Sequence, residues 1–226
     1  SSRVTLQGPI KKDTISYLIA ARRSYVDQLS KLIKFPVPYY FYDLNAKINY
    51  KINSKNRLYV STYFGNDILN ISQDKIEQYG TLSGFGFNLL NSTGPVRLNR
   101  EHSSKLFANY ALITTGFSYD VSGQFTSNSI LVRSTIRDWG GKADYNYYVS
   151  NKHFLKFGFS ATAHVFTPNF ISTSGEITEF IKSRKPIPIY ITEYAAYISD
   201  QYKLSKRWMI NYGVRASGAI VQDTPY

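Results

Sequence analysis

The stretch from Tyr42 to Phe64, YDLNAKINYKINSKNRLYVSTYF, constrains the fold more than any other part of the chain. Between Tyr42 and Ile52, apolar or aromatic residues occupy every even position and polar residues occupy every odd position. Successive side chains of a β-strand point to opposite faces, so this period of two predicts a strand with one apolar and one polar face. Residues 53–56, NSKN, predict a chain reversal, because Asn and Ser hydrogen-bond their own backbone in turns. The alternation then resumes, and the whole stretch predicts a long antiparallel hairpin.

The same turn chemistry recurs at 102–105, 150–153 and 205–207. An interval of roughly 50 residues indicates repeated two-strand units of a meander or barrel. Strands of about 10 to 14 residues, the length of a tilted membrane crossing, are expected between the turns. They are expected at 1–10, 14–27, 95–101, 106–119, 130–149 (broken at Gly140-Gly141), 154–166, 192–202 and 209–221. Longer connections are expected at 29–40 (with a helical turn at 28–33), 65–93, 120–128 and 167–189.

Composition favours a barrel in a membrane. Aromatic residues make up 16% of the 226 residues, with 20 Tyr, although the mean hydropathy is only −0.28. Tyr is well suited to the boundary between hydrocarbon and water, and no apolar run approaches the ~20 residues of a spanning helix. Tight turns at one end and long loops at the other are typical of outer-membrane barrels, although the pattern alone leaves a soluble sandwich open. We therefore expect an all-β fold, a transmembrane antiparallel meander β-barrel, with residues 1–226 in one barrel domain.

The net charge of +12 is compatible with an anionic partner such as nucleic acid or lipid headgroups. Because the basic residues are scattered over turns and loops rather than gathered in one stripe, we expect a solvated periphery facing lipid headgroups, and no nucleic acid. A basic run at 182–185 is a candidate contact with lipopolysaccharide, with a solvated loop tip as the alternative. The chain has no Cys and therefore no thiolate metal site, and we expect neither a metal nor a cofactor.

Five segments carry a resemblance to a known family. They are TISYLIAARRSYVD, YYFYDLNAKINYKINSKNRLYVSTYFGND, LNREHSSKLFANYALI, IRDWGGKADYNYYVSNKHFLKFGF and EYAAYISDQYKLSKRWMINYGVRASG. In this order they resemble the barrel of TonB-dependent outer-membrane receptors, in particular those of Bacteroidetes-type bacteria. The resemblance covers most of the chain apart from its loops.

The resemblance implies a receptor in the outer membrane of a Gram-negative cell. Such a receptor has a 22-stranded barrel with an N-terminal plug, and it imports scarce nutrients such as iron chelates, cobalamin or glycans. The implied partners are a small nutrient ligand, outer-membrane lipid and lipopolysaccharide, and the TonB complex, which acts through the plug. This sequence shows no plug and no TonB-contacting segment before Ser1, and only about ten strands. We therefore expect part of a larger barrel, completed by further strands, with a stand-alone ten-stranded barrel as the alternative.

Candidate functional residues follow from the alternation, because polar alternates are expected to line the lumen. Arg22 and Arg23 are adjacent, so only one of them can point inward. His164 could act as a general base beside a carboxylate, but no spacing indicates a partner, and we interpret it as a polar lumen residue. The chain is therefore expected to be a transporter and not an enzyme, with a small adhesin or rim-active hydrolase barrel as the alternative. The expected ligand-facing or lumen-facing residues are Arg22, Asp43, Asn45, Lys47, Asn49, Asp138, Lys142, Asp144, Lys156 and His164.

Overall fold

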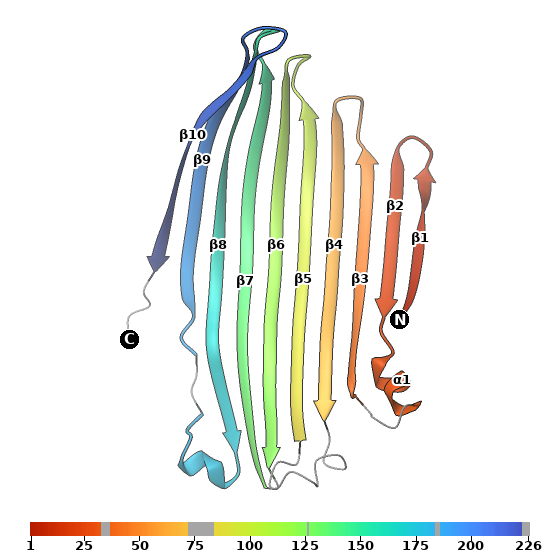
Figure 1. Ribbon diagram of the computed structural model, residues 1–226, viewed down its shortest axis with the longest axis vertical. Coiled ribbons are helices and arrows are strands. Elements are labelled where there is room, and N and C mark those ends of the chain that lie inside the picture. The colour runs from red at the N-terminus through yellow and green to blue at the C-terminus, as the bar shows by residue number, and fades with distance from the viewer. Residues whose placement is uncertain (33–36, 72–83, 126, 184–185, 223–226) are drawn as a thin grey trace.

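The computed structural model describes residues 1–32, 37–71, 84–125, 127–183 and 186–222. Ten strands form a single sheet in which each strand pairs with the next along the chain, and every pairing is antiparallel. Figure 1 shows this meander with the strands side by side in sequence order. The strands are β1 (Ser2–Lys11), β2 (Ile15–Arg23), β3 (Tyr39–Lys51), β4 (Asn56–Ile71), β5 (Gly84–Glu101), β6 (Leu106–Phe125), β7 (Asn128–Tyr148), β8 (His153–Ser174), β9 (Ile189–Lys203) and β10 (Met209–Gln222). The all-β antiparallel meander expected from the sequence is confirmed.

Five tight turns lie at one end of the sheet, and the longer connections lie at the other. The turns β1–β2, β3–β4, β5–β6, β7–β8 and β9–β10 all lie at one end, the top of Figure 1. The connections at the other end include the helix α1 (Val26–Leu32) between β2 and β3, and the short helix η2 (Glu176–Glu179) between β8 and β9. The helical turn expected at 28–33 therefore exists, although it begins earlier, at Val26.

The strands differ in length from the expectation. β5 to β8 contain 18, 20, 21 and 22 residues, about twice the 9 to 11 that a tilted crossing requires. The expected loop at 120–128 is wrong, because β6 continues to Phe125 and β7 begins at Asn128. Much of the expected connections 65–93 and 167–189 is also strand, and residues 72–83 lie outside the described residues. The sequence-based estimate failed here because polar and glycine-rich residues continue the sheet beyond the apolar band.

Smaller boundary errors have similar causes. β1 continues through Gly8 and Pro9 to Lys11, and its pairing with β2 is irregular between Pro9 and Lys11, where a proline without an N–H is tolerated. β2 ends at Arg23 rather than at residue 27, because α1 begins at Val26. β7 runs unbroken through Gly140 and Gly141.

The two faces of the sheet differ in polarity. Most of the exposed large apolar residues in the strands share one face, called here the apolar face, and their parity follows the pairing register from strand to strand. Large apolar surface left in contact with water is unfavourable, so this face requires an apolar environment. Its exposed members include Val4, Leu6, Ile19, Leu44, Ile48, Val60, Val96, Leu112, Trp139, Phe159, Tyr194, Ile198, Val214 and Ile220.

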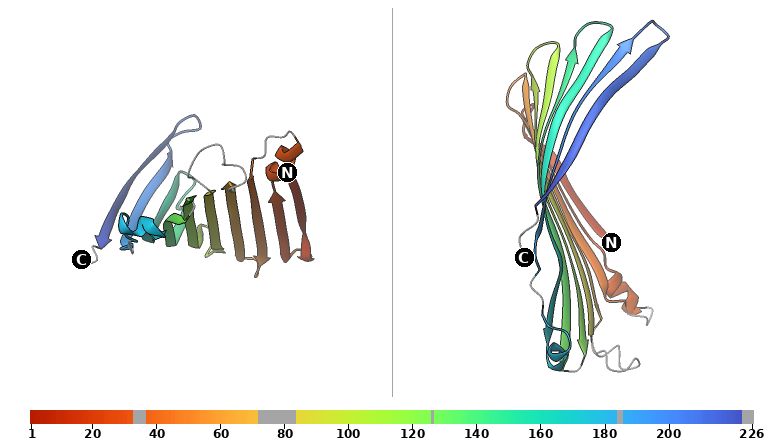
Figure 2. Two further views of the ribbon diagram at one scale, coloured as in Figure 1. Left: turned by 90° about the horizontal axis from the view of Figure 1, so that it is seen from below. Right: turned by 90° about the vertical axis from the view of Figure 1, so that its left-hand side faces the viewer.

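A conventional buried core is nearly absent from the described residues. The buried apolar residues there are Ala20, Ala108, Ala143 and Ala195, and no large side chain is fully buried. Figure 2 shows why: the sheet is a single twisted and curved layer with no second layer packed on either face. The soluble-sandwich alternative is therefore wrong for the described strands. None of the helices in the described residues is long and apolar enough to cross a bilayer.

The sheet is open at both edges. The strand order runs from β1 to β10, and no pairing joins β1 to β10 among the described residues. Figures 1 and 2 show these two strands at opposite margins of the layer. Unpaired edge groups are costly in hydrocarbon, so a membrane-spanning sheet of this kind requires further strands beside β1 and β10.

Candidate functional site

The strand register places all ten candidate residues on one face of the sheet, called here the polar face. In β2 and β3, Arg22 pairs with Asp43. From β3, a row of paired residues runs across the sheet through Asn49, Tyr59, Arg97, Ala111 and Lys142. The candidates of β3 and β7 therefore face the same way, and Lys156 and His164 of β8 share this face through their partners in β7. The two faces arise directly from the period of two in the sequence.

A hydrogen-bonded row around Asp138 joins three strands of the polar face, β6, β7 and β8. His164 Nδ1 lies 2.8 Å from Asp138 Oδ1, and the Thr115 hydroxyl donates to Asp138 Oδ2 at 2.6 Å. On the far side of the imidazole ring, His164 Nε2 is 3.8 Å from Glu193 Oε2, too far for a hydrogen bond, and it is buried without a hydrogen-bond partner. The sequence indicated no partner for His164, and this expectation is wrong, because Asp138 is its partner.

Tyr197 of β9 reaches over β8 to β7. Its hydroxyl donates to Asp144 Oδ1 at 2.7 Å, while Lys142 Nζ lies 3.0 Å from the other carboxylate oxygen. Gly158 sits between Tyr197 and Asp144 in the pairing register. A side chain at this position would meet the carbonyl oxygen of Ala143 at 2.6 Å and Tyr197 Cε1 at 2.9 Å, so the crossing requires glycine.

A second charged pair joins β2 and β3 near the long-connection end. Arg22 Nε and Nη2 lie 2.7 and 2.6 Å from Asp43 Oδ2, and the Arg22 guanidinium also stacks on Phe41, 4.8 Å from the ring centroid. Asp43 is only 9% exposed. Because a buried charge is costly unless it is paired, the ion pair with Arg22 offsets the cost of burying this carboxylate. Arg23 points to the other face, pairing with Asp27 of α1. Only one of the two adjacent arginines shares the candidates' face, as expected.

Cations and aromatic rings meet on the polar face of β3 to β5. Lys47 Nζ and the Arg97 guanidinium lie 5.6 and 4.6 Å from the centroid of the Tyr59 ring. Lys47, Asn49 and Tyr59 line a hollow of about 590 Å³ beside β1 and β2. Lys156 makes a similar contact with Phe154 at 5.1 Å, whereas Asn45 lies between Ala20 and Tyr63 in the register. The register thus gathers the ten candidates on one surface but not at one point.

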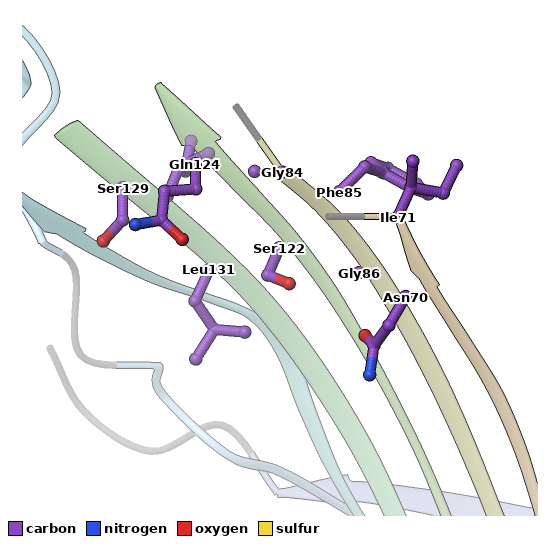
Figure 3. Close-up of a pocket in the computed structure, with 11 residues that line it drawn as sticks. Asn70, Ile71, Gly84, Phe85, Gly86, Ser122, Gln124, Ser129 and Leu131 are labelled. Carbon is purple, nitrogen blue, oxygen red and sulfur yellow. The ribbon is translucent and has the colours of Figure 1, made fainter. Parts of the chain in front are cut away.

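A separate hollow of about 550 Å³ lies at the long-connection end of β4 to β7, on the side of the apolar face but beyond its apolar band. Figure 3 shows the side chains of Asn70, Ser122, Gln124 and Ser129 around it, with Gly84 and Gly86 leaving room between the strands. Apart from Ser129, these residues lie in the regions expected as loops, and none of them was proposed as a site residue. The glycines with neighbouring Asn and Ser were the available signal.

The described contacts of the polar face are hydrogen bonds, ion pairs and cation–aromatic contacts among its own side chains. Among the described residues, no group of three or more His, Asp and Glu side chains is arranged to hold a metal ion. The Thr115 hydroxyl bonds to Asp138 and not to His164, so the described contacts join no nucleophile to the imidazole. The polar face presents carboxylates, amines, amides and phenols, which can form hydrogen bonds with a polar solute.

Thr115, Tyr197 and Glu193 were missed by sequence reasoning. The Asp138–His164 pair had a usable signal: both residues lie thirteen positions from Asn151, the middle of the β7–β8 turn, and therefore face each other in a regular hairpin. Tyr197 and Thr115 had no such signal, because each acts from a neighbouring hairpin whose register depends on turn geometry.

The basic residues lie over turns and loops, as expected, and eleven of the 27 line a single end of the sheet. Lys and Arg side chains gather at the five tight turns, and the surface they form is called here the basic turn edge. Within the described part of the chain, no ion pair links any of them to a carboxylate, whereas Arg22, Arg23 and Arg133 at the opposite end are all paired. The basic turn edge consists of Lys11, Lys12, Lys51, Lys55, Arg57, Arg100, Lys105, Lys152, Lys203, Lys206 and Arg207, accompanied by the acidic Asp13 and Glu101. Of the basic run at 182–185, residues 184–185 lie outside the described residues.

Comparison with known proteins gives a likeness of fold. No protein-family model matches the chain, and no curated protein matches it in sequence. Its structure is similar to that of BauA, the ferric preacinetobactin receptor from Acinetobacter baumannii, with a TM-score of 0.64 and 9% identity over 97% of this chain. It is also similar to the ferripyoverdine receptor of the outer membrane of Pseudomonas aeruginosa, with a TM-score of 0.66 and 9% identity over 97% of this chain. The chain spans 39% and 35% of these two receptors, so the open meander matches part of an outer-membrane receptor barrel.

Proposed function

We propose that this chain forms part of the barrel wall of a TonB-dependent outer-membrane receptor that imports a scarce nutrient. The observation that carries the proposal is the fold match over 97% of the chain to the ferric preacinetobactin receptor and to the ferripyoverdine receptor of the outer membrane. The segregation of the two faces supports it, because a barrel wall needs an apolar face toward lipid and a polar face toward the lumen. The sequence segments resemble the Bacteroidetes-type members of that family.

In the proposed arrangement the polar face lines the lumen. The paired groups Arg22–Asp43, Asp138–His164 and Lys142–Asp144 then lie on the route of the solute or against a plug. Their mixed signs suit a wet interior and do not favour one ligand charge. The nutrient is accordingly proposed as a class, namely an iron chelate, cobalamin or a glycan, taken up through a plugged barrel of 22 strands by energy from the TonB complex.

The open sheet favours this proposal over a self-contained adhesin or hydrolase barrel. A ten-stranded barrel would close by pairing β1 with β10, and the described strands run from β1 to β10 without that pairing. Further strands of a larger barrel would satisfy both edges. No nucleophile contacts His164 in the described structure, which likewise favours a transport role.

The proposal is tested by deleting the gene that encodes the chain and measuring growth on one nutrient class at a time. We expect loss of growth on one class of iron chelate, cobalamin or glycan, rescue by the intact gene, and the protein in the outer-membrane fraction. Rescue should fail when the proton-motive force that drives TonB is collapsed. Normal uptake of all three classes, or a protein found outside the outer membrane, would contradict the proposal.

A further inference from the structure

Four of the five tight turns share one construction that places a basic residue at the tip. In each, the side-chain oxygen of the first residue accepts hydrogen bonds from the backbone N–H groups two and three positions later. The residue two positions later is always basic. The pairs of first residue and basic residue are Asn53 with Lys55, Ser103 with Lys105, Ser150 with Lys152, and Ser205 with Arg207.

The repeated construction spaces these charges evenly along one edge. Successive turns are two strands apart, which corresponds to roughly 10 Å at ~4.8 Å per strand. This spacing is close to the Debye length of about 8 to 10 Å in physiological salt, so neighbouring turns act on a partner as one field. Because Lys55, Lys105 and Lys152 are exposed and have no acidic partner in the described structure, their charge is available to an external anion.

Next to the basic turn edge, the apolar face ends in hydrogen-bonded aromatic groups. His102 Nε2 lies 3.0 Å from the Tyr110 hydroxyl, which also receives a hydrogen bond from Tyr145. Two hairpins further along, Asp200 Oδ2 lies 2.6 Å from His153 Nδ1 and accepts a hydrogen bond from Tyr212 at 2.8 Å. Aromatic rings with polar tips favour the boundary between hydrocarbon and water, so the basic turns lie at the level of the headgroups.

We propose that the basic turn edge binds the phosphate groups of anionic phospholipids in the membrane leaflet on the side of the tight turns. The inference rests on the proposed membrane-spanning barrel and adds a lipid-binding surface to it. A lipid surface fits better than a single soluble anion, because the basic residues follow the edge of the apolar band across all five turns instead of converging on one hollow. Binding of these phosphate groups would hold the receptor at a defined depth in the bilayer.

Trp208, in the β9–β10 turn beside Arg207, provides a reporter with 69% exposure. The intact receptor is reconstituted in vesicles of phosphatidylcholine with phosphatidylglycerol, and either lipid is brominated to quench nearby tryptophan. The Trp208 signal is the difference between the wild type and Trp208→Phe. We expect the phosphatidylglycerol to quench it preferentially. Each basic residue near an anionic surface contributes on the order of a fivefold effect, so K152Q/R207Q should reduce the preference by about tenfold or more.

The matched control is K31Q/K182Q, which removes two exposed lysines from the long-connection end. The control variant should keep the wild-type preference, and sodium chloride should weaken that preference progressively. An unchanged preference in K152Q/R207Q, or an equal loss in the control, would overturn the proposal. The proposal would also be overturned if inorganic phosphate reduced the preference for phosphatidylglycerol more than sodium chloride does at equal ionic strength. That result would mean that the basic turn edge binds free phosphate.

Trp139 separates failure of this inference from failure of the barrel itself. It lies on the apolar face with 52% exposure, and brominated phosphatidylcholine should quench it regardless of the basic turn edge. Quenching of Trp139 without any lipid preference at Trp208 would overturn the lipid-binding inference and leave the barrel standing. Absence of quenching at Trp139, measured against Trp139→Phe, would overturn both.

Discussion

Asp138 and His164 face each other across β7 and β8, with His164 Nδ1 2.8 Å from Asp138 Oδ1. The pair belongs to the middle of the polar face, and the two side chains are 25% and 26% exposed. Thr115 donates to the remaining oxygen of the same carboxylate. Asp138 is therefore the common acceptor that joins three strands on this face.

Replacing Asp138 with Ala should lower the free energy of unfolding by about 1 to 3 kcal/mol, because two donors lose their acceptor in a half-buried site. His164→Gln should cost less, and the double variant should cost less than the sum of the two, since the residues share one interaction. Urea unfolding of the protein in vesicles measures the three values. Additive losses would show that the pair does not interact in the folded protein.

The fold was largely predictable because its local rules are simple. The alternation at 42–52 and the NSKN turn at 53–56 determine both the strands and their faces, and both elements exist as expected. The halves of β5 to β8 next to the long connections were not predictable from alternation. There polar residues such as Ser118, Asp120 and Ser122 occupy the positions at which apolar alternates would mark a strand.

The site was predictable only as a surface. Polar alternates such as Lys47 and Lys142 identified one face correctly, because parity is a property of a single strand. Partnerships between strands were not predictable in general, since Tyr197–Asp144 and Arg22–Asp43 depend on registers set by distant connections. Whether the face lines a lumen remains part of the proposed function.

Asn53→Ala should destabilise the β3–β4 turn. The Asn53 Oδ1 accepts hydrogen bonds from the backbone N–H groups of Lys55 and Asn56, each at 2.9 Å. Losing this acceptor is expected to cost about 0.5 to 1.5 kcal/mol of unfolding free energy and to speed amide hydrogen exchange at Asn56. Ser54→Ala is the matched control in the same turn and should change neither quantity. Equal effects of the two variants would contradict the assigned turn.

The two faces predict opposite tolerance to charge at adjacent residues. Phe159 lies on the apolar face with 58% exposure, whereas Ser160 lies on the polar face. Phe159→Arg should cost about 2 to 4 kcal/mol if this part of β8 crosses the bilayer interior, and Ser160→Arg should cost about 0 to 1 kcal/mol. Folding into vesicles from urea measures both costs. Equal costs would mean that the apolar face does not contact lipid.

Gly158→Ala should break the contact between Tyr197 and Asp144. The added methyl group would meet the Ala143 carbonyl at 2.6 Å and Tyr197 Cε1 at 2.9 Å, so the Tyr ring must move and its 2.7 Å hydrogen bond is lost. We expect a cost of about 1 to 3 kcal/mol, typical of overpacking.

Gly141→Ala is the matched control on the neighbouring strand, because its nearest neighbour is the Leu112 side chain at an ordinary 3.8 Å. This variant should change stability by less than about 0.5 kcal/mol, because the added methyl group makes only an ordinary contact. Adding Tyr197→Phe should then distinguish the two causes of any loss. If loss of the hydrogen bond accounts for the cost of Gly158→Ala, Tyr197→Phe will cost little in the Gly158→Ala background. In the Gly141→Ala background, Tyr197→Phe will cost its full amount. A full additional cost in both backgrounds would mean that Tyr197 keeps its bond to Asp144 without Gly158, and that the glycine is not what permits the crossing.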